Sequence, residues 1–266
     1  MLPKVDYHMH TPLCGHAVGE PSEYVEQALR VGLEEIGFSD HAPLVAYEDA
    51  RYTMNASQLP LYHSMIEAVQ KKYAFFTIKI GLEADYVLGF EEKTRKMLSS
   101  YPYDFVIGSV HFIENWAFDD PDQKLRWKER GVDTVYRDYY SLLRRSASSG
   151  LFDIMGHVDL VKKFGHRATI DLSDEVENTA KVFKKAGVTV EINTSGLRKP
   201  VKEIYPSLDV LKIYQKAGVP ITFSSDSHDP GDVGRDYDKA VTLAKAAGYT
   251  EYLVFRKRKV EKKVKL

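Results

Sequence analysis

The stretch SDEVENTAKVFKKAGVTVEINTS, residues 173–195, contains the unit from which most of the chain is built. Residues 173–186 have an amphipathic helical pattern with acidic residues in the first turn, which suits a helix N-terminus. Gly187 follows as a typical helix stop, and residues 188–192 form a short apolar run rich in β-branched side chains. The polar Asn193 comes next. The stretch therefore predicts a helix, a turn, a buried strand and a polar side chain where that strand ends.

The same unit recurs along the chain. Short apolar runs predict strands at residues 5–7, 35–38, 76–80, 105–107, 152–155, 188–192 and 221–223. Amphipathic runs predict helices at residues 21–31, 57–73, 90–100, 132–148, 173–186, 207–217 and 236–247. Alternating strands and helices imply parallel strands joined by crossover helices, and about seven such units favour a closed α/β barrel over an open sheet. The longest irregular stretch, residues 111–131, is expected to be a long loop over one face.

Composition argues for a globular enzyme and against several other classes. The chain has 266 residues, 44% of them hydrophobic and 28% charged, with a formal net charge of -1. This charge favours neither nucleic acid nor a membrane surface as a partner, and no apolar run is long enough to span a bilayer. The N-terminus lacks the apolar core of a signal peptide, so we expect a cytoplasmic protein. The single cysteine, Cys14, excludes an intrachain disulfide, and the basic residues 256–265 are expected to be a solvated end.

Residues with metal-binding chemistry follow nearly every predicted strand. In chain order they are His8, His10 and His16, then Asp40 and His41, then Glu83, His111, His157, Asn193, Asp226 and His228. In a parallel barrel the C-terminal ends of all strands share one rim, where active sites are built. Seven of the nine histidines are therefore predicted to lie on this rim, and only His63 and His166 are not.

The spacing of these residues predicts a site for several ions. Because side chains alternate along a strand, His8 and His10 face the same side and can chelate one ion; Asp226 and His228 repeat this spacing. Imidazole suits zinc, iron and manganese, and carboxylate suits hard divalent ions and bridging. Seven imidazoles with Glu83 and Asp226 exceed the needs of one ion, so two or three ions with three ligands each are expected.

These motifs resemble the PHP (polymerase and histidinol phosphatase) superfamily, and most closely its histidinol-phosphatase branch. The matching residues are His8-Met9-His10-Thr11, His16, Ser39-Asp40-His41, Gly81-Leu82-Glu83, Gly108-Ser109-Val110-His111, Gly156-His157-Val158-Asp159, Glu191-Ile192-Asn193-Thr194-Ser195-Gly196 and Ser224-Ser225-Asp226-Ser227-His228. The resemblance runs from residue 5 to about residue 250. It implies a distorted (β/α)7 TIM-like barrel, with residues 1–266 forming a single metallophosphoesterase domain.

The resemblance also implies three divalent ions, of zinc, iron or manganese. The ligand sets that it implies are His8, His10, Glu83 and Asp226 for the first ion, Glu83, His111 and His157 for the second, and His16, His41 and His228 for the third. Such a site attracts a dianionic phosphate and makes water available as a nucleophile, so no covalent enzyme intermediate is required.

The expected reaction is hydrolysis of a phosphate monoester, and the resemblance favours L-histidinol phosphate, a substrate of histidine biosynthesis. Glu83 and Asp226 are the catalytic carboxylates, while Asp40 either protonates the leaving alkoxide or orients a ligand imidazole. Candidates for substrate binding are Arg198 and Lys162, which suit phosphate, and Glu114, which only the resemblance assigns to a substrate amine.

Two alternatives stay open at this stage. One is a PHP-type phosphoesterase that acts on nucleotides or other phosphorylated metabolites, and the other is a metal-binding accessory module without catalysis. The neutral charge disfavours a polynucleotide substrate, and a full set of ligands disfavours an inactive module. The sequence leaves the oligomeric state open.

Overall fold

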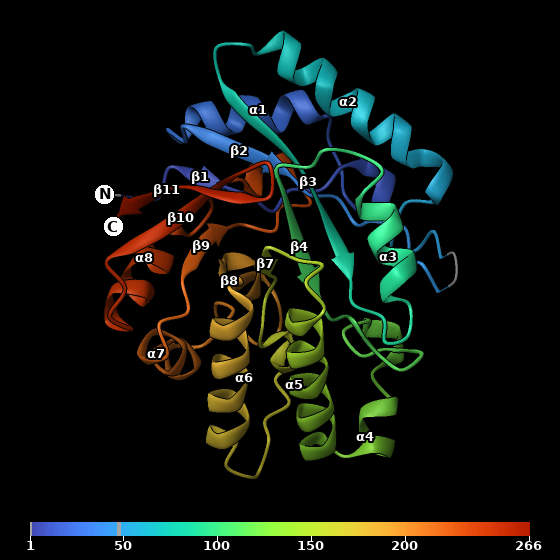
Figure 1. Ribbon diagram of the computed structural model, residues 1–266, viewed down its shortest axis with the longest axis vertical. Helices are drawn as coiled ribbons and strands as arrows, with labels where there is room; N and C mark the ends of the chain where they lie inside the picture. The colour runs from blue at the N-terminus through green and yellow to red at the C-terminus, as the bar shows by residue number, and fades with distance from the viewer. Residues whose placement is uncertain (1, 47–48) are drawn as a thin grey trace.

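Seven parallel strands form the centre of the molecule (Figure 1). The structure, a computed structural model, describes residues 2–46 and 49–266. The strands pair in parallel in the order β1-β2-β3-β4-β7-β8-β9. Their bounds are β1 Val5–Asp6, β2 Glu35–Phe38, β3 Thr77–Asp85, β4 Phe105–Ser109, β7 Ile154–Met155, β8 Thr189–Asn193 and β9 Ile221–Ser224. The predicted α/β fold, a distorted (β/α)7 TIM-like barrel, is confirmed.

The barrel is distorted where the first and last strands meet. In the described residues β1 and β9 share no ladder, and the seam is closed by an isolated parallel bridge between Met9 and Ser227. The Ser227 N–H donates to the carbonyl of His8 across 2.9 Å. Nearer the other end of the seam, the buried Asp6 carboxylate accepts the N–H of Ser225 at 2.9 Å. Closure therefore depends on loop residues and one carboxylate rather than on a full strand pairing.

Helices form an outer layer around these strands (Figure 1). They are α1 Pro21–Arg30, α2 Leu59–Lys72, α3 Glu91–Leu98, α5 Val132–Ser148, α6 Ser173–Ala186, α7 Leu208–Lys216 and α8 Tyr237–Ala246. Local signals explain their ends: α1 begins at a proline behind a capping box, and α6 stops at Gly187, whose φ of 75° is left-handed. Each helix buries an apolar face against the sheet in one continuous core.

The segment that was expected to be a long loop, residues 111–131, contains regular structure instead. Strands β5 Phe112–Ile113 and β6 Trp116–Ala117 form a small hairpin, followed by the 3-10 turn Pro121–Gln123 and helix α4 Arg126–Arg130. Its two tryptophans are buried, and the Trp127 indole N–H donates to the carbonyl of Phe118 at 2.9 Å. Aromatic packing therefore fixes this segment in place.

The C-terminal residues form a hairpin that the sequence analysis did not predict. Strand β10 Glu251–Arg256 pairs antiparallel with β11 Lys259–Lys265, and the mostly exposed β11 fits the expected solvation. The turn reaches the start of β4 (Figure 1), where the Arg258 N–H donates to the carbonyl of Asp104 at 2.8 Å. The Arg258 side chain also pairs with Asp153, just before β7. The hairpin thus covers the end of the barrel opposite the histidine-rich rim.

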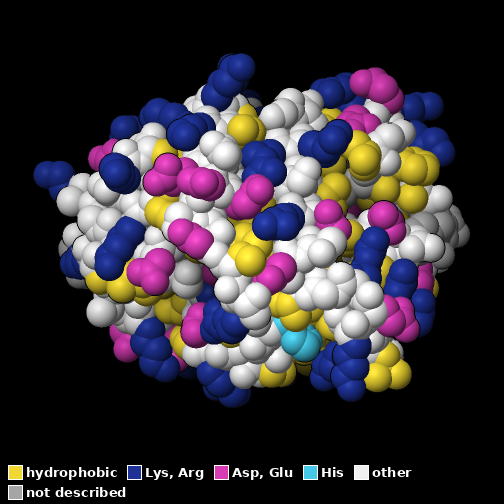
Figure 2. Space-filling model, turned by 90° about the horizontal axis from the view of Figure 1, so that it is seen from below, with side chains coloured by type: hydrophobic (Ala, Val, Ile, Leu, Met, Phe, Trp, Pro, Cys, Tyr) yellow, Lys and Arg dark blue, Asp and Glu magenta, His cyan; other side chains and the backbone are white. Residues whose placement is uncertain are grey.

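Charged side chains of both signs are interspersed on the face seen in Figure 2. Among the described side chains there, Lys and Arg alternate with Asp and Glu, and hydrophobic groups appear in small patches between them. Such mixing does not provide the continuous cationic track that a polynucleotide needs. No helix within residues 2–46 and 49–266 is long and apolar enough to cross a membrane.

Candidate metal centre

Glu83 lies at the centre of the rim formed by the C-terminal strand ends. Its two carboxylate oxygens are each 2.9 Å from an imidazole, Oε1 from His157 Nε2 and Oε2 from His41 Nδ1. Oε2 is also 3.1 Å from His8 Nε2, and the Ser109 hydroxyl donates to Oε1 at 2.6 Å. These side chains come from the ends of five neighbouring strands. The parallel barrel therefore brings residues far apart in the chain to one carboxylate, as the rim prediction requires.

His8 and His10 face the same side of the chain after β1, as strand alternation predicts. Their ring centroids are 5.0 Å apart. His10 Nε2 is 3.3 Å from Asp226 Oδ1 and 3.7 Å from Glu83 Oε2. The four residues expected to bind the first ion thus direct ligand atoms at a common point.

Most of the rim imidazoles are anchored through Nδ1. A carboxylate or carbonyl oxygen can only accept, so each such contact fixes a proton on Nδ1 and leaves Nε2 free as an electron-pair donor. The anchors are Glu191 for His8 (2.6 Å), Asp40 for His10 (3.3 Å), Asp85 for His111 (3.0 Å), the Cys14 carbonyl for His16 (3.0 Å) and the Asp226 carbonyl for His228 (3.3 Å). Metal-binding histidines are held in this way by an oxygen behind the ring.

Eight of the nine predicted ligands gather in overlapping groups whose ligand atoms lie within 4.8 Å of one another, and the ninth, His157, joins the centre through its 2.9 Å contact with Glu83. The groups are His8, His10 and Asp226; His10, His41 and His228; His41, Glu83 and His111; Cys14, His16 and His228; and His10, Cys14 and Asp40. Two members, the Cys14 thiol and Asp40, were not expected as ligands. His41 lies between Glu83 and the pair His16 and His228, so the assignment of each residue to one ion stays a prediction.

Two of the expected ligands have unusual backbone conformations. His157 has a φ of 25° and Asp226 a φ of 52°, both on the left-handed side, where a residue other than glycine is strained. Hydrogen bonds hold both in place: the His157 N–H donates to Glu191 at 3.0 Å, and the Asp226 carboxylate accepts the Asn193 amide at 3.1 Å and the Ser195 hydroxyl at 2.9 Å. Strain at two positions on the same rim is typical of a functional site.

Electrostatics in the rim favour added positive charge. Burial alone would lower the pKa of His8, but the Glu191 and Glu83 carboxylates raise it well above the ordinary value. The pKa of His10 is likewise raised against the effect of burial, chiefly by its hydrogen bond with Asp226. Burial would raise the pKa values of Glu83 and Asp226, yet the surrounding imidazoles hold both well below the usual range. The carboxylates therefore favour positive charge beside them, which protons on the imidazoles can supply or which metal ions that replace those protons would supply.

The donor set fits divalent metal ions. Among the described residues, His8 Nε2, His10 Nε2 and Glu83 Oε2 are buried atoms that make no hydrogen bond. A buried polar atom without a partner costs about 1–3 kcal/mol, and here three such atoms face one another. Free imidazole nitrogens beside free carboxylate oxygens are the ligands that zinc, iron and manganese accept. Coordinated ions would satisfy all three atoms together.

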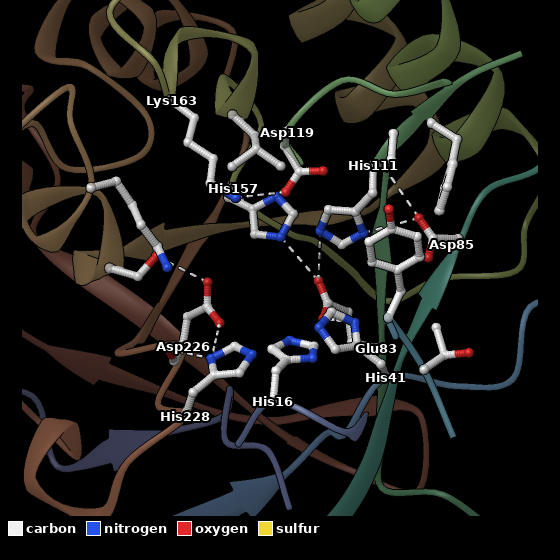
Figure 3. A pocket seen from close by; sticks show the side chains of 17 residues that line it. His16, His41, Glu83, Asp85, His111, Asp119, His157, Lys163, Asp226 and His228 are labelled. Carbon is white, nitrogen blue, oxygen red and sulfur yellow. Dashed lines mark hydrogen bonds and ion pairs between the residues drawn. The ribbon is translucent and has the colours of Figure 1, made fainter. Parts of the chain in front are cut away.

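A cavity of about 270 Å³ opens beside these residues. Figure 3 shows the rings of His16, His41, His111, His157 and His228 around an open space that separates Glu83 from Asp226. Tyr52, Phe112 and Leu160 add apolar wall. The size suits a small molecule rather than a polymer.

Two lysines that the sequence analysis did not select line this cavity. Lys163 Nζ lies 2.8 Å from an oxygen of Asp119, which also lines the cavity (Figure 3). Lys199 stands on the wall near Asp226, and its partial burial lowers its pKa. Both residues directly follow the cations that had been predicted to bind phosphate.

Those predicted cations, Arg198 and Lys162, do not line the cavity. The Arg198 guanidinium donates to the carbonyl of Ser225 at 2.6 Å and pairs with Asp232 at 3.0 Å. Lys162 is only 2% exposed and pairs with Asp159 at 2.8 Å. These contacts hold both side chains against protein groups, although Arg198 Nη1 is a buried atom without a hydrogen-bond partner. Their role in phosphate binding stays a prediction, and the neighbours Lys163 and Lys199 join them as candidates.

The carboxylates Glu114 and Asp40 also differ from their expected positions. The Glu114 side chain is 72% exposed, pairs with Arg130 at 2.8 Å and lies outside the cavity lining. Asp40 is completely buried behind the ligands, where it accepts the His41 N–H at 2.8 Å and faces His10 Nδ1. Of the two roles open for Asp40, this position favours orienting an imidazole over donating a proton to substrate.

Comparisons with known proteins agree with this site. The sequence pattern of the PHP domain matches residues 6–195. The chain is 42% identical to a probable histidinol-phosphatase of Deinococcus radiodurans, over 96% of this chain and 98% of that protein. It is 32% identical to the histidinol-phosphatase of Bacillus subtilis, over 89% and 98% of the two chains.

A solved structure of a histidinol phosphate phosphatase is also similar to this chain. The crystal structure of histidinol phosphate phosphatase from Lactococcus lactis, in complex with zinc, L-histidinol and phosphate, has a TM-score of 0.85 and 27% sequence identity to this chain. The match covers 98% of this chain and all (100%) of that one. With the PHP domain matched over most of its length and relatives aligned nearly end to end, the chain belongs to the PHP family.

Proposed function

We propose that this protein is a metal-dependent phosphoric monoester hydrolase that converts L-histidinol phosphate to L-histidinol and phosphate in histidine biosynthesis. The observation that carries the proposal is the ring of anchored imidazoles around Glu83, open to a cavity that holds a small molecule. The similarity to named histidinol-phosphatases supports the substrate, since one of them was solved with L-histidinol and phosphate. We further propose that residues 1–266 act as one cytoplasmic domain.

The proposed cofactor is a set of three divalent ions, of zinc, iron or manganese. The zinc in the Lactococcus lactis structure supports the use of a divalent metal. The proposed ligands are His8, His10, Glu83 and Asp226 for the first ion, Glu83, His111 and His157 for the second, and His16, His41 and His228 for the third. The close approach of ligand atoms in His8, His10 and Asp226 supports the first of these sets. When bound, such ions neutralise phosphate charge and lower the pKa of water.

The side chains of the cavity complete the phosphate site. The ammonium groups of Lys163 and Lys199 carry the positive charge needed to bind phosphate oxygens outside the metal ligands. Asp119 fixes Lys163 through a 2.8 Å ion pair, which reduces the conformational freedom that binding would otherwise remove. Asp40 holds the His10 ring from behind, and its burial there supports the orienting role over proton donation.

A nucleotide phosphatase is the alternative that uses the same metal site. The similarity to named histidinol-phosphatases favours L-histidinol phosphate over a nucleotide as the substrate. Phosphate release from zinc-loaded and manganese-loaded protein should be measured with L-histidinol phosphate, nucleotides and other monoesters. Preferential turnover of L-histidinol phosphate is expected. Faster hydrolysis of nucleotides, or no turnover by fully metal-loaded protein, would refute the proposal.

The phosphate contacts are tested by comparing adjacent residues. Loss of one charged hydrogen bond costs about 1.5–3 kcal/mol, so Lys199→Met and Lys163→Met should each lower kcat/KM about 10–100-fold. Arg198→Met and Lys162→Met are the matched controls. Lys162 contacts protein groups only, and Arg198 is held by Ser225 and Asp232, with Nη1 left without a hydrogen-bond partner. The controls should lower thermal stability more than kcat/KM. The reverse pattern would return phosphate binding to Arg198 and Lys162.

A further inference from the structure

Glu191 is a completely buried carboxylate in the middle of β8 and does not line the cavity. Its Oε1 faces three donors: His8 Nδ1 at 2.6 Å, the Asn193 amide at 3.0 Å and the Ser224 hydroxyl. Its Oε2 accepts the His157 N–H at 3.0 Å. One side chain thus satisfies four buried donors from β1, β8, β9 and the end of β7.

We infer that Glu191 is a positioning residue that couples two metal sites. Its two oxygens contact different ligands: Oε1 orients the His8 ring, proposed for the first ion, and Oε2 fixes the His157 main chain, proposed for the second. This inference rests on the proposed metal centre but not on the identity of the substrate. Because one rigid carboxylate sets both ligands, a change at Glu191 affects both sites at once.

The His8 contact determines which nitrogen can bind metal. Glu191 can only accept, so Nδ1 carries the proton and Nε2 keeps its lone pair, 3.1 Å from Glu83 Oε2. The negative charge behind the ring also makes Nε2 a stronger donor to a metal ion. Without Glu191, the His8 ring loses both its orientation and its tautomer.

The His157 contact holds a strained backbone. With a φ of 25°, His157 is in a conformation that a non-glycine residue leaves unless neighbouring groups retain it. The hydrogen bond from its N–H to Glu191 is one restraint, and the bond from the Tyr139 hydroxyl to its carbonyl, at 3.0 Å, is another. If the first is removed, relaxation would turn the imidazole away from Glu83.

A glutamine cannot replace Glu191, although it has the same shape. Every group that faces the two oxygens is a donor, so the amide NH₂ meets a donor in either orientation. In one orientation the NH₂ group faces the His157 N–H, and in the other it faces the donors of His8, Asn193 and Ser224. Glu191→Gln therefore removes the acceptor for one ligand in every arrangement. Because the amide is neutral, the hydrogen bond that remains to the other ligand also loses its charge assistance and weakens, so both metal sites lose support.

The test is zinc stoichiometry, measured by elemental analysis after dialysis against buffers of defined free zinc. Removing an anchor of this kind weakens metal affinity about 10–100-fold, so Glu191→Gln should lose the first and second ions together and keep the third. Glu35→Gln is the matched control, because Glu35 is also a buried strand carboxylate but lies at the opposite end of the barrel, beside Lys79. It should melt earlier than wild type with unchanged zinc content.

Glu191→Asp is the second variant in case the glutamine variant does not fold. It keeps the charge but is shorter by one methylene, so it cannot reach both His8 and His157 and should show the same paired loss. A wild-type zinc titration in either variant, or loss of one ion alone, would overturn the coupling. If wild-type protein fails to hydrolyse L-histidinol phosphate while the paired zinc loss is seen, the proposed function falls and the coupling stands.

Discussion

A single methyl group at Gly156 should damage the metal centre. Gly156 directly precedes His157, and a Cβ at this position would lie 2.7 Å from Ser109 Oγ, 2.9 Å from Ile107 Cγ2 and 3.2 Å from Glu191 Oε2. The first two distances are too short to be tolerated without movement. Gly156 is not among the glycines with positive φ, so Gly156→Ala tests crowding rather than backbone conformation.

The expected losses of stability and of metal affinity in Gly156→Ala follow from the groups that the new methyl displaces. Overpacking of a tight site costs about 1–3 kcal/mol, which lowers the Tm of a chain this size by about 2–4 °C per kcal/mol. The Ser109 hydroxyl must leave its 2.6 Å hydrogen bond to Glu83, the central carboxylate of the rim. Displacing such a supporting group weakens metal binding about 10–100-fold. The expected variant therefore folds, melts earlier and holds less metal.

Elemental analysis, thermal unfolding with and without added zinc, and phosphate release together form the assay. Gly231→Ala is the matched control, because Gly231 is exposed and its new Cβ meets only Asp229 Oδ1, at 3.2 Å. The reasoning fails if Gly156→Ala keeps wild-type metal content and kcat, or if excess zinc does not restore part of its turnover.

Three further outcomes are expected. Removal of metal by a chelator should abolish turnover and lower the Tm, because the buried ligand atoms then have no partner. Added zinc should reverse both effects, and turnover in fully metal-free protein would contradict the prediction. Asp6→Asn should lower the free energy of unfolding in urea by about 2–3 kcal/mol, because Asp6 accepts the N–H groups of Ser225 and Gly234 at the barrel seam. An unchanged urea midpoint would show that the Asp6 carboxylate does not stabilise the seam. Arg258→Ala leaves Asp153 without its ion pair and should lower the free energy of unfolding by about 1–3 kcal/mol without loss of metal. A variant with less metal would refute the view that the hairpin end of the barrel acts independently of the metal site.

Local patterns were sufficient to predict most of the barrel. The predicted helix 132–148 coincides with α5, and the strand predicted at 188–192 is observed at Thr189–Asn193. Both have strong apolar periodicity and clear boundaries. In the C-terminal hairpin, the buried apolar run 252–255 of β10 was a strand signal that the prediction did not use. Strand β11 had no such signal, because it is solvent-exposed and rich in lysine. The position of the hairpin depends on contacts with Asp104 and Asp153, which are distant in sequence.

The groups behind the metal ligands could not be predicted in the same way. The histidines stand out because imidazoles are rare and fall after strands, whereas the anchor Glu191 lies inside β8 and the anchor Asp85 is the last residue of β3. One signal was present: a carboxylate within the buried run 188–192 requires buried partners. Which partners it has depends on how β8 sits beside β1 and β9, and that information is tertiary.

The cations proposed to bind phosphate show a second limit, which has a geometric cause. Lys162 and Arg198 each end a 3-10 turn, Leu160–Lys162 and Thr194–Arg198, and the cavity-lining lysine follows each turn directly. In such a turn, successive side chains point about 120° apart, so adjacent cations face different directions. Strand alternation allowed His8 and His10 to be placed on one face, but no equivalent rule applies to a short turn whose orientation is set by packing. Lys199 faces the cavity because Arg198 is held against Ser225 and Asp232, and breaking those contacts alone should leave Lys199 free to bind phosphate.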